Sequence, residues 1–190
     1  KWDAVAKSAD AERYVVCNAD ESEPGTFKDR VVMEGDPFAL VEGMAIAGLA
    51  VGSRKGFLYI RGEYPLAIRR MQHAIDCARQ ANLLGDNILN SGVSFDIEIR
   101  RGAGAYICGE ETALFNSIEG QRGEPRNKPP YPVQHGLFNK PTVINNVETL
   151  VNMPLILREG GAAFAALGTG ASKGRKLFCV SGHVAQPGVY

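Results

Sequence analysis

The chain has 190 residues, 45% of them hydrophobic and 22% charged, and it carries 21 Lys+Arg against 21 Asp+Glu. These values are typical of a globular protein with one substantial core, and the zero net charge excludes a whole-chain basic field that would recruit nucleic acid. No apolar stretch is long enough to cross a bilayer, and the few cysteines form no Cys-x-x-Cys pair. We therefore expect a cytoplasmic protein with no nucleic-acid partner, no direct membrane insertion and no metal site.

Hydrophobic periodicity predicts strands that alternate with helices along the chain. The apolar run at 14–17 is typical of a buried strand, and the alternation over 94–99 predicts a strand with one wetter face. Asp36 followed by Pro37 is typical of a helix start, and the apolar stripe of that helix is Phe38, Val41, Ala45 and Leu49. In chain order we expect strand 14–17, helix 36–52, strand 56–60, helix 65–84, strand 94–99, helix 110–118, a helix from Asn145 or Asn146 to 158, short helix 162–167 and strand 176–181.

This order of elements is typical of an α/β layered domain with a mostly parallel sheet, which is the fold class we predict. Ligands in such sheets bind beyond the carboxyl ends of the strands. Loops 18–25 and 101–109 both follow strands, so we expect them at one rim, facing one crevice. The domain is placed at 1–168, and 175–190 is expected to hold the first strand of a small β unit. A start without Met and the abrupt end at Tyr190 indicate a piece of a longer polypeptide.

Residues 101–112 begin like a phosphate-binding loop and then become acidic. Gly104 and Gly109 have the P-loop spacing, but Glu110 and Glu111 stand where that loop needs Lys and Ser or Thr. The dinucleotide fingerprint fails as well, because its third glycine is missing. We expect a loop that lets a ligand approach the backbone closely, with carboxylates that accept hydrogen bonds from ribose hydroxyls, a ring amide or a ring N–H.

The polar loop after the first strand carries Asn18, Asp20, Glu21 and Glu23. Three interpretations stay open for it: a solvated turn, acceptors for an organic ligand, or a Mg²⁺ or Ca²⁺ site. Lys28 and Arg30 lie nearby in sequence as counter-charges.

Later residues leave similar alternatives open. Asn145 and Asn146 at a helix start either cap the helix or mark an anion site at its positive end. Lys128 and Tyr131 on a proline-rich loop can neutralise a diphosphate and stack on a flat ring, or merely belong to a connection. Tyr106 is either another flat-ring partner or a core tyrosine.

No catalytic residue is predicted. Cys108 has no histidine near it in sequence to activate the thiol, and the chain contains only three histidines. Glycines, a helix end, carboxylates and aromatic rings instead favour chemistry carried by bound cofactors that the protein positions. A hypothesis from a different class is a non-catalytic, partner-binding fragment that holds no such cofactor.

Four motifs stand out along the chain: Cys-Asn-Ala-Asp-Glu-Ser-Glu-Pro-Gly (17–25), Arg-Gly-Ala-Gly-Ala-Tyr-Ile-Cys-Gly-Glu-Glu-Thr-Ala-Leu (101–114), Pro-Arg-Asn-Lys-Pro-Pro (125–130) and Ile-Asn-Asn-Val-Glu-Thr-Leu (144–150). They resemble the FMN- and NADH-binding subunit of respiratory complex I, and the resemblance covers essentially the whole chain. The same module occurs in NAD-reducing and electron-bifurcating hydrogenases and in NAD-dependent formate dehydrogenases.

The resemblance implies that NADH and FMN share one cavity, that hydride passes between them, and that electrons then leave singly to iron–sulfur clusters. Glu111 is the implied ribose partner, and its carboxylate would reject the extra phosphate of NADPH. The implied FMN contacts are Asn18, Asp20, Glu21, Tyr106, Gly109 and Glu110, with Asn145 and Asn146 at the phosphate and Lys1 ending a flavin loop. The implied NADH contacts are Glu23, Glu111, Lys128 and Tyr131.

The family also has parts that this chain lacks. They are a glycine-rich segment before Lys1, the rest of a ubiquitin-like β unit, and a helical domain whose Cys-x-x-Cys-x-x-Cys cluster holds [4Fe–4S]. The implied partners are a thioredoxin-like [2Fe–2S] subunit and other iron–sulfur subunits in the peripheral arm of a complex. Those partners decide whether the complex reduces quinone, oxidises hydrogen or oxidises formate.

Overall fold

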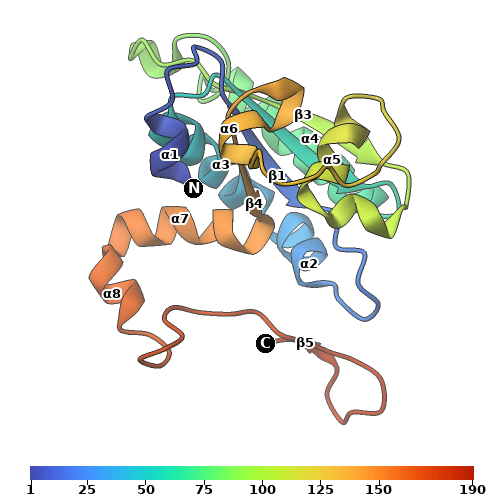
Figure 1. Ribbon diagram of the computed structural model, residues 1–190. Coiled ribbons are helices and arrows are strands. Elements are labelled where there is room, and N and C mark those ends of the chain that lie inside the picture. Colours follow the sequence, from blue (N-terminus) through green and yellow to red (C-terminus); the bar gives the residue numbers. More distant parts are fainter.

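The computed structural model describes residues 1–190 and has a four-stranded parallel sheet at its centre (Figure 1). Its strands are β1 (Tyr14–Ala19), β2 (Lys55–Arg61), β3 (Asp96–Gly102) and β4 (Thr142–Asn146), in the order β3-β2-β1-β4. The α-helices are α1 (Trp2–Ala6), α2 (Lys28–Gly35), α3 (Pro37–Val51), α4 (Pro65–Gln80), α5 (Glu111–Ile118), α6 (Pro132–His135), α7 (Val147–Glu159) and α8 (Gly161–Ala165). Three short 3₁₀ segments are η1 (Ile88–Asn90), η2 (Tyr106–Gly109) and η3 (Leu137–Asn139), and β5 (Cys179–Val180) pairs with β6 (Gly188–Val189) as an antiparallel hairpin. The predicted fold class is confirmed.

Alternation along the strands divides the core between the two faces of the sheet. Val15 and Cys17 of β1 belong to a cluster of 24 buried residues that also includes side chains of α1, α3, α4 and α7. Val16 points the other way, into a smaller cluster built on α5 and η3. The result is a sheet with helices on both faces, and Asn18, which has the same parity as Val16, lies on the α5 side.

Helix α3 begins as its sequence predicts, but its buried face matches only part of the predicted stripe. The Asp36 carboxylate accepts from the Ala39 N–H at 3.2 Å, and Gly52 ends the helix at φ +69°. The predicted stripe is half right: Val41 is buried and Ala45 packs against the core, but Phe38 is 50% and Leu49 63% exposed. This helix is apolar nearly all round, so periodicity could not identify the buried side.

The largest difference from the sequence-based prediction is β4. The strand was not predicted, whereas the helix after it was: α7 starts at Val147 with Asn146, one of the two expected caps, as its N-cap. Helices α1, α2 and α6 were not predicted, β3 extends to Gly102, and the strand expected over 176–181 contains only Cys179–Val180. The five residues of β4 follow a proline and end in two asparagines, so their strand character depends on pairing with β1.

Strand order places a topological switch point beside β1. From β1 the chain continues to β2 and β3 on one side, and β4 then pairs with β1 on the other side. All four strands are parallel, so their carboxyl ends meet at one edge. The crevice between the ends of β1 and β4 is where open α/β sheets bind ligands.

The C-terminal segment after residue 168 lies apart from most of the α/β body (Figure 1). None of its residues is buried, whereas the body contains both apolar clusters. None of the helices combines the length and apolar character that a membrane crossing requires.

Candidate functional site

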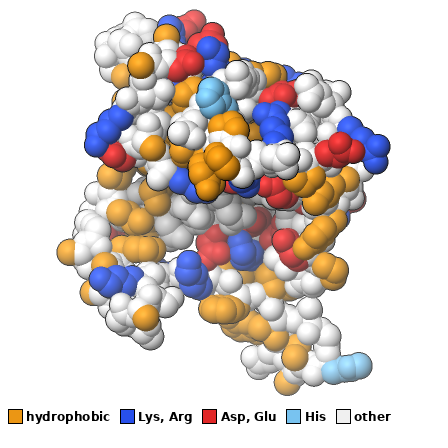
Figure 2. All heavy atoms as spheres, viewed as in Figure 1, with side chains coloured by type: hydrophobic (Ala, Val, Ile, Leu, Met, Phe, Trp, Pro, Cys, Tyr) orange, Lys and Arg blue, Asp and Glu red, His pale blue; other side chains and the backbone are white.

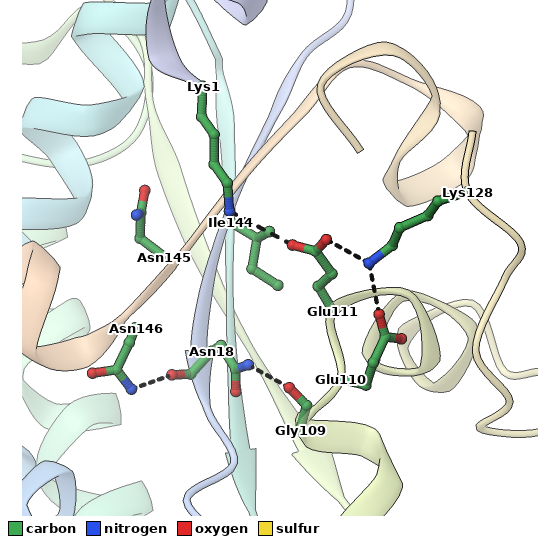
Figure 3. Close-up of a pocket in the computed structure, with 9 residues that line it drawn as sticks. All are labelled: Lys1, Asn18, Gly109, Glu110, Glu111, Lys128, Ile144, Asn145 and Asn146. Atoms are coloured by element: carbon green, nitrogen blue, oxygen red, sulfur yellow. Dashed lines mark hydrogen bonds and ion pairs between the residues drawn. The ribbon is translucent and has the colours of Figure 1, made fainter. Parts of the chain in front are cut away.

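Three adjoining hollows lie along the carboxyl edge of the sheet. The central pocket, of about 390 Å³, is lined by Lys1, Asn18, Gly109, Glu110, Glu111, Lys128, Ile144, Asn145 and Asn146 (Figure 3). The acidic pocket, of about 300 Å³, is lined by Asn18, Asp20, Glu21, Glu23, Thr26, Lys28, Asp29, Gly109 and Asn146. The side crevice, of about 170 Å³, is lined by Lys1, Glu111, Tyr131, Pro132, Val133, Thr142 and Ile144. The first two have the size of small-molecule sites, and they share part of their walls.

These hollows bring together nearly all the site residues predicted from the sequence. Every one of them lines a hollow except Tyr106, which lies on η2 just before Gly109 and is 62% exposed. Tyr106 is therefore not a core tyrosine, and its role as a flat-ring partner stays a prediction. Figure 2 shows acidic and basic side chains side by side around the hollow at the centre of this face.

Asn18 ties the end of β1 to the glycine loop. Its amide nitrogen donates to the carbonyl of Gly109 at 2.9 Å, and its amide oxygen accepts from the N–H of Asp20 at 3.2 Å. A side chain at Gly109 would place a Cβ 3.2 Å from the Asp20 carboxylate, a tight contact. The two loops expected to share a rim do so, and glycine keeps the backbone at Gly109 open to approach.

Glu110 closes the start of α5 to anions. One carboxylate oxygen accepts from the N–H groups of Thr112 and Ala113, at 2.8 and 2.9 Å, so the helix end is already capped. The other oxygen accepts from Lys128 at 2.9 Å. Partial burial opposes ionisation, but the hydrogen bonds from Thr112, Lys128 and Ala113 outweigh it and lower the pKa of Glu110. This is the structural reason why the glycine loop is not a phosphate loop.

Glu111 lies between two lysines from distant parts of the chain. Its carboxylate accepts from Lys128 at 2.7 Å and lies 3.7 Å from the Lys1 ammonium (Figure 3). Hydrogen bonds to Glu111 and then Glu110 raise the pKa of Lys128. The cation predicted on the proline-rich loop therefore faces the central pocket already paired with carboxylates.

The two buried acids behave differently from each other. Asp20 is 2% exposed, its carboxylate accepts from the Ser22 hydroxyl, and burial raises its pKa. The Glu21 carboxylate accepts from the N–H groups of Asp29 and Arg30 at the start of α2, at 2.8 and 3.0 Å, and from the Tyr64 hydroxyl at 3.1 Å. Burial raises the pKa of Glu21 as well. The Glu21 carboxylate is therefore already held by the protein, and because both acids are buried, the solvated-turn interpretation is wrong for them.

Only one of the two asparagines, Asn145 and Asn146, caps the helix, and the other is available to a ligand. Asn146 is the N-cap, accepting from the N–H of Glu148 at 3.0 Å, and its amide is fully engaged by the protein. Asn145 does not cap α7. Its oxygen accepts from the Trp2 indole at 2.8 Å, which leaves its amide nitrogen available to a ligand in the central pocket.

Residues of α2 and α7 also belong to the site and were not predicted as such. Lys28 and the buried Asp29 line the acidic pocket and contact Asn146, and Glu148 of α7 pairs with Lys28 at 3.2 Å. In the sequence Lys28 was only a nearby counter-charge, because α2 was not predicted. No three His, Cys, Asp or Glu side chains are grouped so as to hold a metal ion.

The donor set suits an organic cofactor with a phosphate. An open backbone at Gly109 permits close approach of a flat ring, a free amide at Asn145 and the ammonium of Lys1 suit an anion, and carboxylates suit hydroxyl and N–H groups. The residues present therefore fit a flavin mononucleotide. Fold and site together define a nucleotide-cofactor-binding α/β domain.

Comparison with known proteins agrees with this class. The family model described as the Nuo51 FMN-binding domain matches residues 1–155, and the chain belongs to this family. It is 54% identical over 190 residues to an NADH-quinone oxidoreductase subunit of Rhizobium meliloti (strain 1021), covering 100% of this chain and 45% of that protein. It is 52% identical over 189 residues to the NADP-reducing hydrogenase subunit HndC of Solidesulfovibrio fructosivorans, covering 100% of this chain and 38% of that protein.

Solved structures agree as well. The chain superposes with a TM-score of 0.90 on a crystal structure of an NAD⁺-reducing [NiFe]-hydrogenase in the air-oxidised state, at 48% identity, covering 100% of this chain and 31% of the other. The chain spans less than half the length of the two curated relatives. The matches therefore establish the family of the chain, and the activity of a whole protein is a separate matter.

Proposed function

We propose that this chain is the cofactor-binding core of an NADH:acceptor oxidoreductase. When bound, FMN supplies hydride acceptance from NADH and release of single electrons. The observation that most supports the proposal is the convergence of residues at the ends of β1 and β4 and in the loop after β3, together with the proline-rich loop, on adjoining hollows. The protein would position the two cofactors and supply no acid, base or nucleophile of its own.

The phosphate of FMN would bind at the Asn145 end of the central pocket. The free Asn145 amide and the Lys1 ammonium are donors there, and the positive end of α7 starts one residue further on. The ring would lie against the backbone at Gly109, beside Tyr106. Asp20, Glu21 and Glu110, which line the two pockets, would face the ring and its hydroxyl chain.

NADH would contact Glu111 and Lys128 in the central pocket, Tyr131 in the side crevice and Glu23 in the acidic pocket. A ribose has hydroxyls that a carboxylate accepts, so Glu111 is the proposed ribose partner. The same carboxylate would repel the 2′-phosphate of NADPH. Because a 52% identical relative is named for NADP, coenzyme preference should be measured as kcat/KM with NADH against NADPH.

The whole protein would pass electrons to iron–sulfur subunits, including a thioredoxin-like [2Fe–2S] partner, in the cytoplasmic peripheral arm of a complex. Its missing parts would include the helical domain that holds [4Fe–4S]. We place the cofactor domain at residues 1–168 and the first strand of a ubiquitin-like unit within 175–190. The hydrogenase relatives support the diaphorase subunit of an NAD-reducing hydrogenase as a second candidate.

The proposal is tested first by flavin absorption of the full-length protein. A protein that stays colourless after addition of FMN would favour the non-catalytic scaffold.

The second test is Glu111→Lys, which would place a third cation beside Lys1 and Lys128. We expect kcat/KM for NADH to fall about 100-fold or more, because two charge-assisted hydrogen bonds to ribose are worth about 3 kcal/mol or more and each 1.4 kcal/mol is tenfold. Bound FMN, measured by absorbance, should remain. Glu124→Lys is the matched control, since Glu124 is an exposed glutamate paired only with Arg122. Normal NADH oxidation by Glu111→Lys would contradict the assignment.

A further inference from the structure

Lys28 has no role in the proposed function, yet it lines the acidic pocket, and its ammonium contacts three protein groups there. It donates to Asp29 at 2.6 Å and to the Asn146 amide oxygen at 3.0 Å, and it lies 3.2 Å from the Glu148 carboxylate. An ammonium has three N–H donors, so these acceptors engage all of them. With its side chain only 19% exposed, Lys28 is built to hold protein groups and is not free to bind a ligand.

The ammonium and a buried carboxylate fix the orientation of the Asn146 amide. Its oxygen faces Lys28, while its nitrogen donates to the Asp29 carboxylate at 2.6 Å and to the carbonyl of Asn18 at 3.3 Å. A reversed amide would set NH₂ against the ammonium and oxygen against the carboxylate. Only one orientation of Asn146 is therefore compatible with a charged Lys28.

From Asn146 the hydrogen bonds continue to the glycine loop. The Asn18 carbonyl accepts from Asn146, and the Asn18 amide nitrogen donates to the Gly109 carbonyl at 2.9 Å (Figure 3). A continuous chain therefore runs from α2 through the ends of β4 and β1 to the backbone that lines both pockets.

We propose that Lys28 is a positioning residue for the crevice, and that it holds Gly109 at the carboxyl edge of the sheet through Asn146 and Asn18. The inference rests on the proposed function in one respect, that Gly109 is where the flavin approaches the backbone. This role requires that the Lys28 ammonium carry its positive charge. Burial opposes it, but the hydrogen bonds to Asp29 and Glu148 outweigh burial and raise the pKa of Lys28 above its ordinary value.

The test is Lys28→Met in the full-length protein, because methionine keeps an unbranched apolar stem and removes the charge. Losing one charge-assisted hydrogen bond in the chain is expected to weaken FMN binding about tenfold. In the flavin-free protein, deuterium uptake of the peptide covering 105–110 should rise by a similar factor. Lys28→Arg, which restores a cation and donors, should return both values most of the way.

Arg30→Met is the matched control. Arg30 lies on the same helix, two residues on, and its side chain is half exposed and ion-paired with Glu34. We expect its FMN affinity and its exchange at 105–110 to equal those of the wild type. A Lys28→Met protein that is less stable, but has wild-type FMN affinity and wild-type exchange at 105–110, would show that Lys28 only supports the fold.

A second variant keeps the inference falsifiable if Lys28→Met does not fold. Glu148→Gln removes the charge that pairs with Lys28 but keeps an oxygen for the N–H of Leu177. Because charge-assisted bonds are about twice as strong as neutral ones, we expect roughly threefold weaker FMN binding and faster exchange at 105–110. No change in either would overturn the inference. Wild-type protein that binds no FMN would contradict the proposed function alone, since exchange in flavin-free protein still tests Lys28.

Discussion

At the scale of single residues, the protein gives up stability to keep the Asp20 carboxylate buried in the wall of the acidic pocket. Asp20 is almost completely buried, and its carboxylate has the Ser22 hydroxyl as its hydrogen-bond donor. Burial raises its pKa despite that hydrogen bond and the nearby charge of Arg61. A buried carboxylate with so few donors is unfavourable when ionised, which is common for groups that serve a site and not the fold.

Asp20→Asn is therefore expected to raise the free energy of unfolding at pH 7. With a raised pKa, the folded state binds the Asp20 proton more tightly than the unfolded state does. The contribution of Asp20 to stability is thus complete below its ordinary pKa of 3.8 and is lost as the pH rises through the raised value. The advantage of Asp20→Asn should shrink as the pH falls towards that ordinary value. Urea unfolding at pH 7 and pH 4 measures the difference in free energy of unfolding between Asp20→Asn and the wild type. Asp86→Asn is the control, because Asp86 is exposed. A less stable Asp20→Asn protein at pH 7 would contradict the argument.

At the scale of elements, glycines decide how α3 packs. A Cβ at Gly43 would lie 2.2 Å from the backbone oxygen of Leu150 in α7, and one at Gly48 would lie 2.4 Å from the ring of Phe95. These glycines mark the side of α3 that touches α7 and the core, and the exposed Phe38 and Leu49 lie elsewhere on the helix. Since α7 carries Asn146 and Glu148 at its start, this packing also helps to place the site.

Gly43→Ala is expected to destabilise the protein by about 1–3 kcal/mol, the usual cost of overpacking a core. Gly35→Ala, at the end of α2, is the control, because nothing lies within 4 Å of the Cβ it adds. That change should be neutral or stabilising by up to about 1 kcal/mol, because glycine is unfavourable in a helix. Chemical unfolding of both variants gives the comparison. Equal stabilities would mean that α3 and α7 can separate without loss.

At the scale of the whole molecule, the α/β body and the C-terminal segment differ in how firmly they are held. The hairpin β5–β6 is attached to the body mainly by two hydrogen bonds, from the N–H of Leu177 to Glu148 at 2.9 Å and from the N–H of Phe27 to the Cys179 sulfur at 3.1 Å. None of its residues is buried. Segments with few buried contacts open at low free energy.

Limited proteolysis of the 190-residue chain should therefore cut first between residues 168 and 176 and leave the body intact. Deuterium uptake in β5–β6 should be about 100-fold faster or more than in β1 and β2, whose amides open only with the core. First cuts within the sheet would contradict both the domain boundary placed at 168 and this order of stability.

The sequence alone predicted much of the fold and named most of the residues that line the three hollows. Period-two and helical patterns located β1, β2, β3, α3, α4 and α5, because their apolar residues are numerous enough to show a period. Acidic residues in the glycine loop already excluded a phosphate loop, and Glu110 does cap the helix that a phosphate would need.

Tertiary structure decided the rest. The strand β4 is too short to be recognised alone and exists through its pairing with β1, which creates the switch point and sets Asn145 beside Lys1. Likewise the role of Lys28 depends on partners 118 residues or more away, which no local pattern can indicate. Local chemistry is encoded in neighbouring residues and can be read from them, whereas the arrangement of a binding crevice depends on which distant strands and helices pack together.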